Sequence, residues 1–227
     1  MSKITPKHIA IIMDGNRRWA EKKGLSTFSG HKQGVENVRN IVKVAGKAGI
    51  KYLTLYIFST ENWKRDKQEV KYLLNLIDWA MQKYLDEFDN QGAKINIFGD
   101  LNSFPKKLQK TILYGIKRLS GNNKIIVNLA LNYGARDEIL HAIKNLIKAS
   151  AVTEKEFSKL LYTGQANVPN PDLVIRTGGE LRLSNFLLWQ AAYSELYFID
   201  KLWPDFSKND FKKAIDEFQS RKRRFGK

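Results

Sequence analysis

The sequence predicts a single α/β domain with a central, mostly parallel six-stranded sheet flanked by helices. Short apolar runs rich in β-branched residues alternate with longer amphipathic stretches, which is typical of a parallel sheet covered on both faces. Hydrophobic residues make up 43% of the 227-residue chain, enough for one sizeable core, and no Pro-, Gly- or Ser-rich linker divides it. We therefore expect one domain over residues 1–227.

Strands and helices are expected in alternation. The first strand, residues 8–13, reads HIAIIM and is apolar on both faces, as a central parallel strand requires. Further strands are expected at residues 52–58, 95–98, 125–131, 173–175 and 194–198. Apolar positions at helical spacing predict helices at residues 30–47, 69–88, 105–120, 136–148 and 210–224. Ligands bind at the carboxyl ends of parallel strands, so the polar segments there are the candidate site.

The composition limits the partners and the location. The formal net charge is +16, from 39 Lys and Arg against 23 Asp and Glu, which favours nucleic acid, anionic lipid or a small polyanionic substrate. The chain has no cysteine, which excludes disulfides and Cys-ligated metals. No run approaches the ~18 apolar residues of a membrane span, and the first residues lack a signal-peptide pattern. A cytoplasmic location is expected.

The segment after the first strand, residues 14–19, reads DGNRRW. Gly15 permits a tight turn, and a helix start presents unpaired backbone N–H groups to an anion. Arg17 and Arg18 add fixed cationic donors. Asp14 could hold Mg²⁺ against a diphosphate, because Mg²⁺ favours carboxylate, phosphate and water oxygens. An ordinary strand–turn–helix with Asp14 as a cap is equally compatible with this segment alone.

Two further polar segments follow later strands. Residues 59–65 read STENWKR, and residues 176–185 read RTGGELRLSN, with two arginines and a serine around a glycine pair. Such guanidinium and hydroxyl groups can grip a second diphosphate, at roughly 1.5–3 kcal/mol for each charge-assisted hydrogen bond. Taken singly, each segment is also compatible with an exposed loop. His31 is compatible with either a structural role or a phosphate contact.

Together these segments resemble the cis-prenyltransferase family, closest to the bacterial undecaprenyl diphosphate synthases, over nearly the whole chain. The ordered strings are HIAIIMDGNRRWA, GH at residues 30–31, FSTENW at residues 58–63, and RTGGELRLSNFLLWQ followed by Glu195. The resemblance implies a Mg²⁺-dependent homodimer that adds successive isopentenyl diphosphates in cis to farnesyl diphosphate. The implied product is undecaprenyl diphosphate, the lipid-carrier precursor for cell-wall synthesis, held in an apolar tunnel through the fold.

The resemblance also implies roles by matching position. Asp14 and Asn62 are the catalytic residues, and Asp14 and Glu195 are the carboxylates associated with Mg²⁺. An amide is a poor general base, so we expect Asn62 to position substrate. Arg17 stands where many relatives have Gly, and Thr27 where many have Arg. The implied substrate-binding residues are Gly15, Asn16, Arg17, Arg18, Trp19, Thr27, His31, Ser59, Thr60, Glu61, Trp63, Arg65, Glu69, Arg176, Arg182, Leu183, Ser184, Arg224 and Gly226.

Several alternatives remain open on the sequence. A medium-chain cis-prenyl diphosphate synthase shares these motifs, and a non-catalytic anion- or lipid-binding module or partner subunit is a further reading. No nucleic-acid partner is expected, because carboxylates, glycines and arginines gather at strand ends instead of alternating with exposed aromatics. Ile125 is the candidate tunnel floor. The basic residues 221–224 are compatible with a solvated helix end or with loose contact with anionic lipid at the inner face of the cell membrane.

Overall fold

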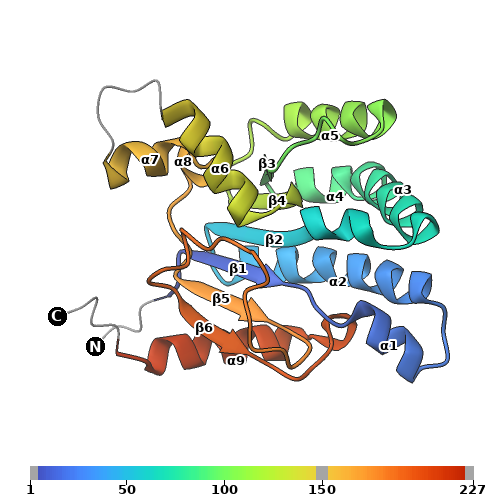
Figure 1. Cartoon of the computed structure of the whole chain (residues 1–227). Coiled ribbons are helices and arrows are strands. Elements are labelled where there is room, and N and C mark those ends of the chain that lie inside the picture. Colours follow the sequence, from blue (N-terminus) through green and yellow to red (C-terminus); the bar gives the residue numbers. More distant parts are fainter. Residues whose placement is uncertain (1–4, 147–152, 223–227) are drawn as a thin grey trace.

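The computed structural model describes residues 5–146 and 153–222, and a six-stranded parallel sheet lies at its centre (Figure 1). The strand order is β3-β4-β2-β1-β5-β6, and every neighbouring pair is parallel. The strands are β1 (His8–Ile12), β2 (Tyr52–Ser59), β3 (Ala93–Phe98), β4 (Ile125–Tyr133), β5 (Leu173–Arg176) and β6 (Glu195–Phe198). The predicted α/β fold is therefore confirmed.

Helices cover both faces of this sheet (Figure 1). They are α1 (Asn16–Lys22), α2 (Thr27–Lys47), α3 (Lys67–Lys83), α4 (Leu85–Asn90), α5 (Lys106–Arg118), α6 (Ala135–Leu146), α7 (Glu154–Leu160), α8 (Tyr162–Gln165) and α9 (Lys208–Ser220), with 3-10 turns η1 (Thr60–Lys64) and η2 (Trp203–Asp205). One face packs against α2, α3, α5 and α9, and the other against α6, α8 and the chain after β5. Both faces of β1 are thus buried, which explains its continuous apolar run.

Several helix boundaries differ from the prediction; the helix predicted at residues 210–224, for example, is α9, which ends at Ser220 because Arg221 has an extended backbone. Two further differences have identifiable reasons. The stretch at residues 69–88 forms two helices, because α3 ends at Lys83 and the chain turns at Tyr84, with φ −103° and ψ 4°. Helix α2 begins at Thr27 instead of residue 30, because the Ser26 hydroxyl accepts a hydrogen bond from the backbone N–H of Ser29. Short α7 and α8 were not predicted; neither has the length that makes helical periodicity readable.

The strand register brings the three polar segments to one edge of the sheet. Ile12 at the end of β1 is aligned with Tyr56 of β2 and with Arg176 of β5. Because these strands are parallel, the segments that follow them emerge side by side, as the sequence predicted. Within residues 5–146 and 153–222, none of the helices combines the length and hydrophobicity that a membrane crossing demands.

Candidate active site

The turn after β1 depends on glycine at position 15. Gly15 has a φ of 112°, and a Cβ at this position would lie 2.7 Å from Leu202 Cδ2. A side chain would therefore meet both backbone strain and a steric clash. The turn leaves the Asp14 carboxylate at the sheet edge and starts α1, which carries Arg17 and Arg18.

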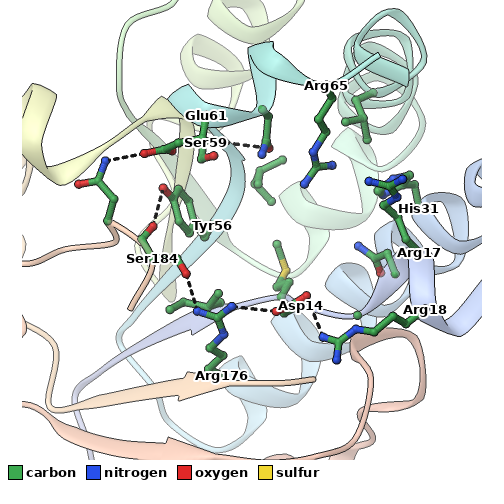
Figure 2. A pocket seen from close by; sticks show the side chains of 18 of the residues that line it. Asp14, Arg17, Arg18, His31, Tyr56, Ser59, Glu61, Arg65, Arg176 and Ser184 are labelled. Atoms are coloured by element: carbon green, nitrogen blue, oxygen red, sulfur yellow. Dashed lines mark hydrogen bonds and ion pairs between the residues drawn. The ribbon is translucent and has the colours of Figure 1, made fainter. Parts of the chain in front are cut away.

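Asp14 lies between two guanidinium groups (Figure 2). Arg176 Nη2 donates to Asp14 Oδ2 at 2.8 Å, and Arg18 Nη2 lies 3.3 Å from Asp14 Oδ1. The other terminal nitrogen of Arg176 donates to Ser184 Oγ at 2.7 Å and to the Arg182 carbonyl at 2.5 Å. The Arg176 side chain is only 5% exposed. One buried guanidinium thus joins the segment after β1 to the segment after β5.

Arg18 is held by the glycine turn after β5. Its Nη1 donates to the Gly178 carbonyl at 2.7 Å and lies 3.8 Å from Glu180 Oε1. Gly178 has a φ of 89°, and a Cβ there would lie 2.6 Å from Arg18 Nη2. Glycine at this position is therefore what allows the guanidinium to lie against the backbone.

Glu69 links three elements around the site. Its Oε1 accepts from Arg65 Nη1 at 3.1 Å and lies 3.2 Å from His31 Nε2, while its Oε2 lies 3.9 Å from Arg17 Nη1. Burial lowers the pKa of His31 from its ordinary 6.5, although the hydrogen bond with Glu69 opposes this shift. His31 is therefore neutral at pH 7, and its Nε2–H donates to the Glu69 carboxylate.

Turn η1 is stabilised by hydrogen bonds at its own start and by a hydrogen bond to the loop after β5. Asn62 Oδ1 accepts from the Ser59 backbone N–H at 3.1 Å, and the Ser59 side chain accepts from the Asn62 backbone N–H. Glu61 Oε1 accepts from Asn185 Nδ2 at 2.9 Å, and Asn185 Oδ1 accepts from the Arg136 backbone N–H at 2.9 Å. Asn185 therefore fixes the position of η1 relative to the segment that carries Ser184.

These segments surround one cavity of about 850 Å³. The predicted site residues that line it are Asp14, Gly15, Asn16, Arg17, Arg18, His31, Ser59, Glu61, Asn62, Arg65, Arg176 and Ser184. Lining residues that sequence reasoning missed include Met13, Glu21, Tyr56, Ile57, Leu73 and Asn185. Two of these had a signal in the sequence: Asn185 directly follows Ser184, and Glu21 lies one helical turn after Arg17 and Arg18.

Several predicted residues do not line the cavity. They are Trp19, Thr27, Thr60, Trp63, Glu69, Arg182 and Leu183. The indole N–H of Trp19 donates to Asp205 at 2.8 Å, and that of Trp63 donates to Asn132 at 2.8 Å, so both rings have structural partners. Arg182 pairs with Glu180 at 2.7 Å and has a side chain that is 60% exposed.

Glu195 is not brought to Asp14 within this chain. It begins β6 opposite Leu173, at the amino ends of the parallel strands, whereas Asp14 follows their carboxyl ends. Its Oε2 accepts from Arg221 Nη1 at 2.9 Å. The role of Glu195 at a metal therefore stays a prediction, and the predicted residues Arg224 and Gly226 lie outside the described part of the chain.

Two smaller apolar cavities continue from the polar one between α2, α3 and the sheet. The first, of about 60 Å³, shares Met13, His31, Ile57 and Leu73 with the polar cavity. The second, of about 70 Å³, is enclosed by Val35, Val38, Arg39, Val42, Ile57, Ile77, Ala80, Met81, Tyr84, Phe88, Ile95, Val127, Leu129 and Leu131. Ile125, the candidate tunnel floor, does not line either of them.

The residues present fit a Mg²⁺ ion that is shared with a diphosphate. In residues 5–146 and 153–222, no three His, Asp or Glu side chains converge as a ready metal site. Asp14 offers one carboxylate at the cavity, with a side chain that is 30% exposed. One carboxylate completed by phosphate oxygens and water is the ligand set that Mg²⁺ favours.

A parallel sheet that holds an arginine-flanked carboxylate above apolar cavities defines a class of enzyme whose substrate has an anionic head and an apolar tail. Residues 12–226 match the model of a prenyltransferase family described as "Putative undecaprenyl diphosphate synthase". The chain is 47% identical to an isoprenyl transferase of Oceanobacillus iheyensis, over 97% of this chain and 90% of that protein. It is also 47% identical to an isoprenyl transferase of Fusobacterium nucleatum, over 100% of this chain and 98% of that protein.

Two solved structures are similar throughout. A lavandulyl diphosphate synthase from Lavandula x intermedia, in complex with dimethylallyl diphosphate, has a TM-score of 0.95 at 35% identity, covering 98% of this chain and 99% of that one. A "probable undecaprenyl diphosphate synthase" from Campylobacter jejuni has a TM-score of 0.84 at 35% identity, covering 99% and 100%. The chain belongs to the cis-prenyltransferase family, and the protein is a transferase.

Proposed function

We propose that this protein adds successive isopentenyl diphosphates in cis to farnesyl diphosphate and gives undecaprenyl diphosphate, a precursor of the lipid carrier for cell-wall synthesis. The observation that carries the proposal is the position of Asp14, between Arg18 and Arg176, at the mouth of cavities that become apolar. The proposal includes Mg²⁺ dependence, a homodimer and a cytoplasmic location with product release at the membrane.

The allylic substrate is the one that loses its diphosphate group. As the allylic C–O bond breaks, negative charge collects on the leaving diphosphate and positive character on the carbon. Arg17, Arg18 and the Gly15–Asn16 turn present donors to this anion, and His31 supports the same region through Glu69. Mg²⁺, when bound beside Asp14, supplies further neutralisation of the leaving group.

The isopentenyl diphosphate is held by the segment after β5. Arg176 is buried and already bonded to Ser184, so its guanidinium needs little reorganisation to donate to a phosphate oxygen. Arg182 joins it from the exposed side. The new carbon–carbon bond forms at the isopentenyl double bond while C2 releases a proton. A diphosphate oxygen accepts that proton, and Asn62, whose Oδ1 is already occupied by Ser59, positions the substrate.

The growing chain follows the apolar cavities between α2 and α3. Most of the side chains that line the second cavity are aliphatic or aromatic, which suits an isoprenoid tail, and the donors of Arg39 and Tyr84 already have carboxylate partners in Glu87 and Glu36. The present volume of about 70 Å³ is small, so α3 must move away from α2 as the chain lengthens. Glu69 lies in the first turn of α3 and would transmit that movement to Arg65 and His31.

The test is to incubate the purified protein with farnesyl diphosphate, labelled isopentenyl diphosphate and Mg²⁺, and to measure the butanol-extractable label and the product length. Addition of EDTA and the Asp14→Ala variant are the controls, and sedimentation velocity reports the dimer. Mg²⁺-dependent product of eleven isoprene units is the expected result. Shorter products would assign a medium-chain synthase, and no incorporation with any allylic primer would assign a non-catalytic binding module or partner subunit.

A further inference from the structure

The outer face of α5 combines exposed apolar side chains with cations. Leu113 is 57% exposed and Tyr114 is 59% exposed, which is unusual for large apolar residues on adjacent positions of a helix. The inner face, which packs on the protein, carries Leu108, Ile112 and Gly115. The outward residues, spaced over three turns, are Lys106, Lys110, Leu113, Tyr114 and Lys117.

This face carries positive charge with little compensation. Helix α5 has five basic residues and no acidic one, and residues 101–136 contain no Asp or Glu at all. Lys107 pairs with Asp78 at 3.3 Å, and Arg118 pairs with Asp86 at 2.5 Å, so these two cations are directed at neighbouring helices. The α5 lysines that form no ion pair in the described part of the chain are Lys106, Lys110 and Lys117.

We propose that α5 docks the protein on an anionic lipid bilayer, lying parallel to its surface. Leu113 and the Tyr114 ring enter the boundary between headgroups and acyl chains, where amphipathic helices and aromatic rings are stabilised. The three unpaired lysines contact lipid phosphates on both sides of this apolar pair. The helix has 13 residues and is therefore about 20 Å long, so several headgroups lie along it.

The position of α5 relates this surface to the apolar cavities. A Cβ at Gly115 would lie 2.7 Å from Met81 Cε, so the backbone of α5 packs directly on a side chain that lines the second apolar cavity. Figure 1 shows α5 beside α3, the helix that forms this wall. A docked bilayer would lie one helix away from the path that we propose for the growing isoprenoid chain. The transfer of a lipid product to that bilayer rests on the proposed function, whereas the docking surface itself does not.

A second copy of this chain is a poorer fit to the same face. A two-fold contact through α5 would oppose Lys106, Lys110 and Lys117 with the same three lysines, and α5 has no acidic residue to neutralise them. A nucleic acid would satisfy the lysines but would leave Leu113 without an apolar partner. An anionic bilayer matches both the charge and the exposed apolar side chains.

The first test measures sedimentation of the full chain with phosphatidylcholine vesicles, with and without 30% phosphatidylglycerol, at 0.1 M salt. Changing Lys106, Lys110 and Lys117 together to Gln should weaken binding to the anionic vesicles by roughly 100-fold, at about fivefold for each lysine. The matched control changes Lys43, Lys47 and Lys208 to Gln. These exposed lysines of α2 and α9 also lack ion pairs in the described residues. Equal losses of binding in both triple variants would show that binding depends on the net charge and not on the position of the lysines, and would overturn the proposal.

The second test measures insertion and makes use of the absence of cysteine from the chain. A polarity-sensitive fluorophore on Leu113→Cys should shift to the blue when anionic vesicles are added. The same label on Leu140→Cys, which replaces a residue 58% exposed on α6, should not shift. A shift at neither position, or a Leu113→Gln variant that converts a dimer to a monomer, would overturn the proposal. Transfer activity in detergent is assayed in parallel, so failure of the proposed function is recognised separately.

Discussion

Arg176 donates a hydrogen bond of 2.8 Å to Asp14, and the same guanidinium donates to Ser184 at 2.7 Å. These contacts connect the ends of β1 and β5 through one side chain that is only 5% exposed. A buried guanidinium is stabilised by such acceptors, and in exchange it neutralises the carboxylate. The side chains that we propose to hold the diphosphates are therefore already connected before a substrate binds.

Replacing Arg176 with Lys should reduce kcat/KM for isopentenyl diphosphate roughly 100-fold, because an ammonium group cannot bridge three acceptors with fixed geometry. Steady-state incorporation of labelled isopentenyl diphosphate measures this loss. Arg182→Lys is the matched control, since the Arg182 side chain is 60% exposed and, among the residues that the structure describes, forms an ion pair with Glu180 alone. Equal losses in both variants would contradict a special role for the buried bridge.

Asn185 is expected to position the isopentenyl site through Glu61. Asn185 has a φ of 63°, so Gly, which adopts this conformation freely, removes the amide without adding strain. Asn185→Gly should raise KM for isopentenyl diphosphate about tenfold through the lost contacts to Glu61 and Arg136, and leave KM for the allylic primer unchanged. Asn185→Asp places a second carboxylate against that of Glu61 and should raise this KM further. Equal effects on both KM values would refute the assignment.

Asn62→Asp tests whether the amide itself is required. Asp keeps an oxygen that can accept from the Ser59 N–H, so η1 should fold normally and the melting temperature should change little. The new negative charge near the diphosphates should reduce kcat by at least about tenfold. A fully active Asn62→Asp variant would rule out a specific need for the amide.

Product length should respond to Ala80, which lines the second apolar cavity. Ala80→Phe fills that space and should shorten the products, as read by chromatography of the extracted lipids. Ile125→Ala is the control: Ile125 is 1% exposed but lies outside the cavity wall, so its truncation should cost about 2–5 kcal/mol of stability and leave length unchanged. Longer products from Ile125→Ala would restore Ile125 as the tunnel floor.

The sheet and much of the site were predictable because their signals are local. Residues 8–13 form a short run that is apolar on both faces, which is typical of a central parallel strand. Asp14 follows β1 and Arg176 ends β5, so their meeting at one edge follows from the parallel topology. The division of the helix at Tyr84 was not predictable, because apolar spacing continues through it.

The remaining site residues depend on tertiary contacts that carry no local signal. Tyr56 faces the cavity because β2 pairs with β1 and β4, and its hydroxyl donates to the Ser184 carbonyl at 3.4 Å. Trp63 was expected among the substrates, but Asn132 fixes its indole at 2.8 Å beside the cavity. Glu195 lies at the opposite sheet edge, which strand assignment could have indicated from its place at the start of β6.

The His8 ring has a fixed pattern of hydrogen bonds inside the sheet. Its Nδ1 lies 2.6 Å from the Pro169 carbonyl, which can only accept, so Nδ1 carries the proton. Its Nε2 therefore accepts from the Thr54 hydroxyl at 2.7 Å, and that hydroxyl accepts from Asn128 Nδ2 at 2.9 Å. Burial lowers the pKa of His8 from 6.5 to about 4, against opposing contributions from Pro169 and Asp172.

Protonation of His8 should make the protein lose stability as the pH falls from 6.5 toward 4. Between these pH values His8 is protonated in the unfolded chain but stays neutral in the folded one. Its contribution to the free energy of unfolding is therefore fully present above pH 6.5 and is lost as the pH falls. The loss should approach about 3 kcal/mol, at roughly 1.4 kcal/mol for each pH unit. His8→Asn, which has no titratable ring, should be less stable at pH 7.5 but less dependent on pH. Urea unfolding of both proteins between pH 4.5 and 7.5 measures the difference, and parallel curves would show that His8 titrates normally in the folded state.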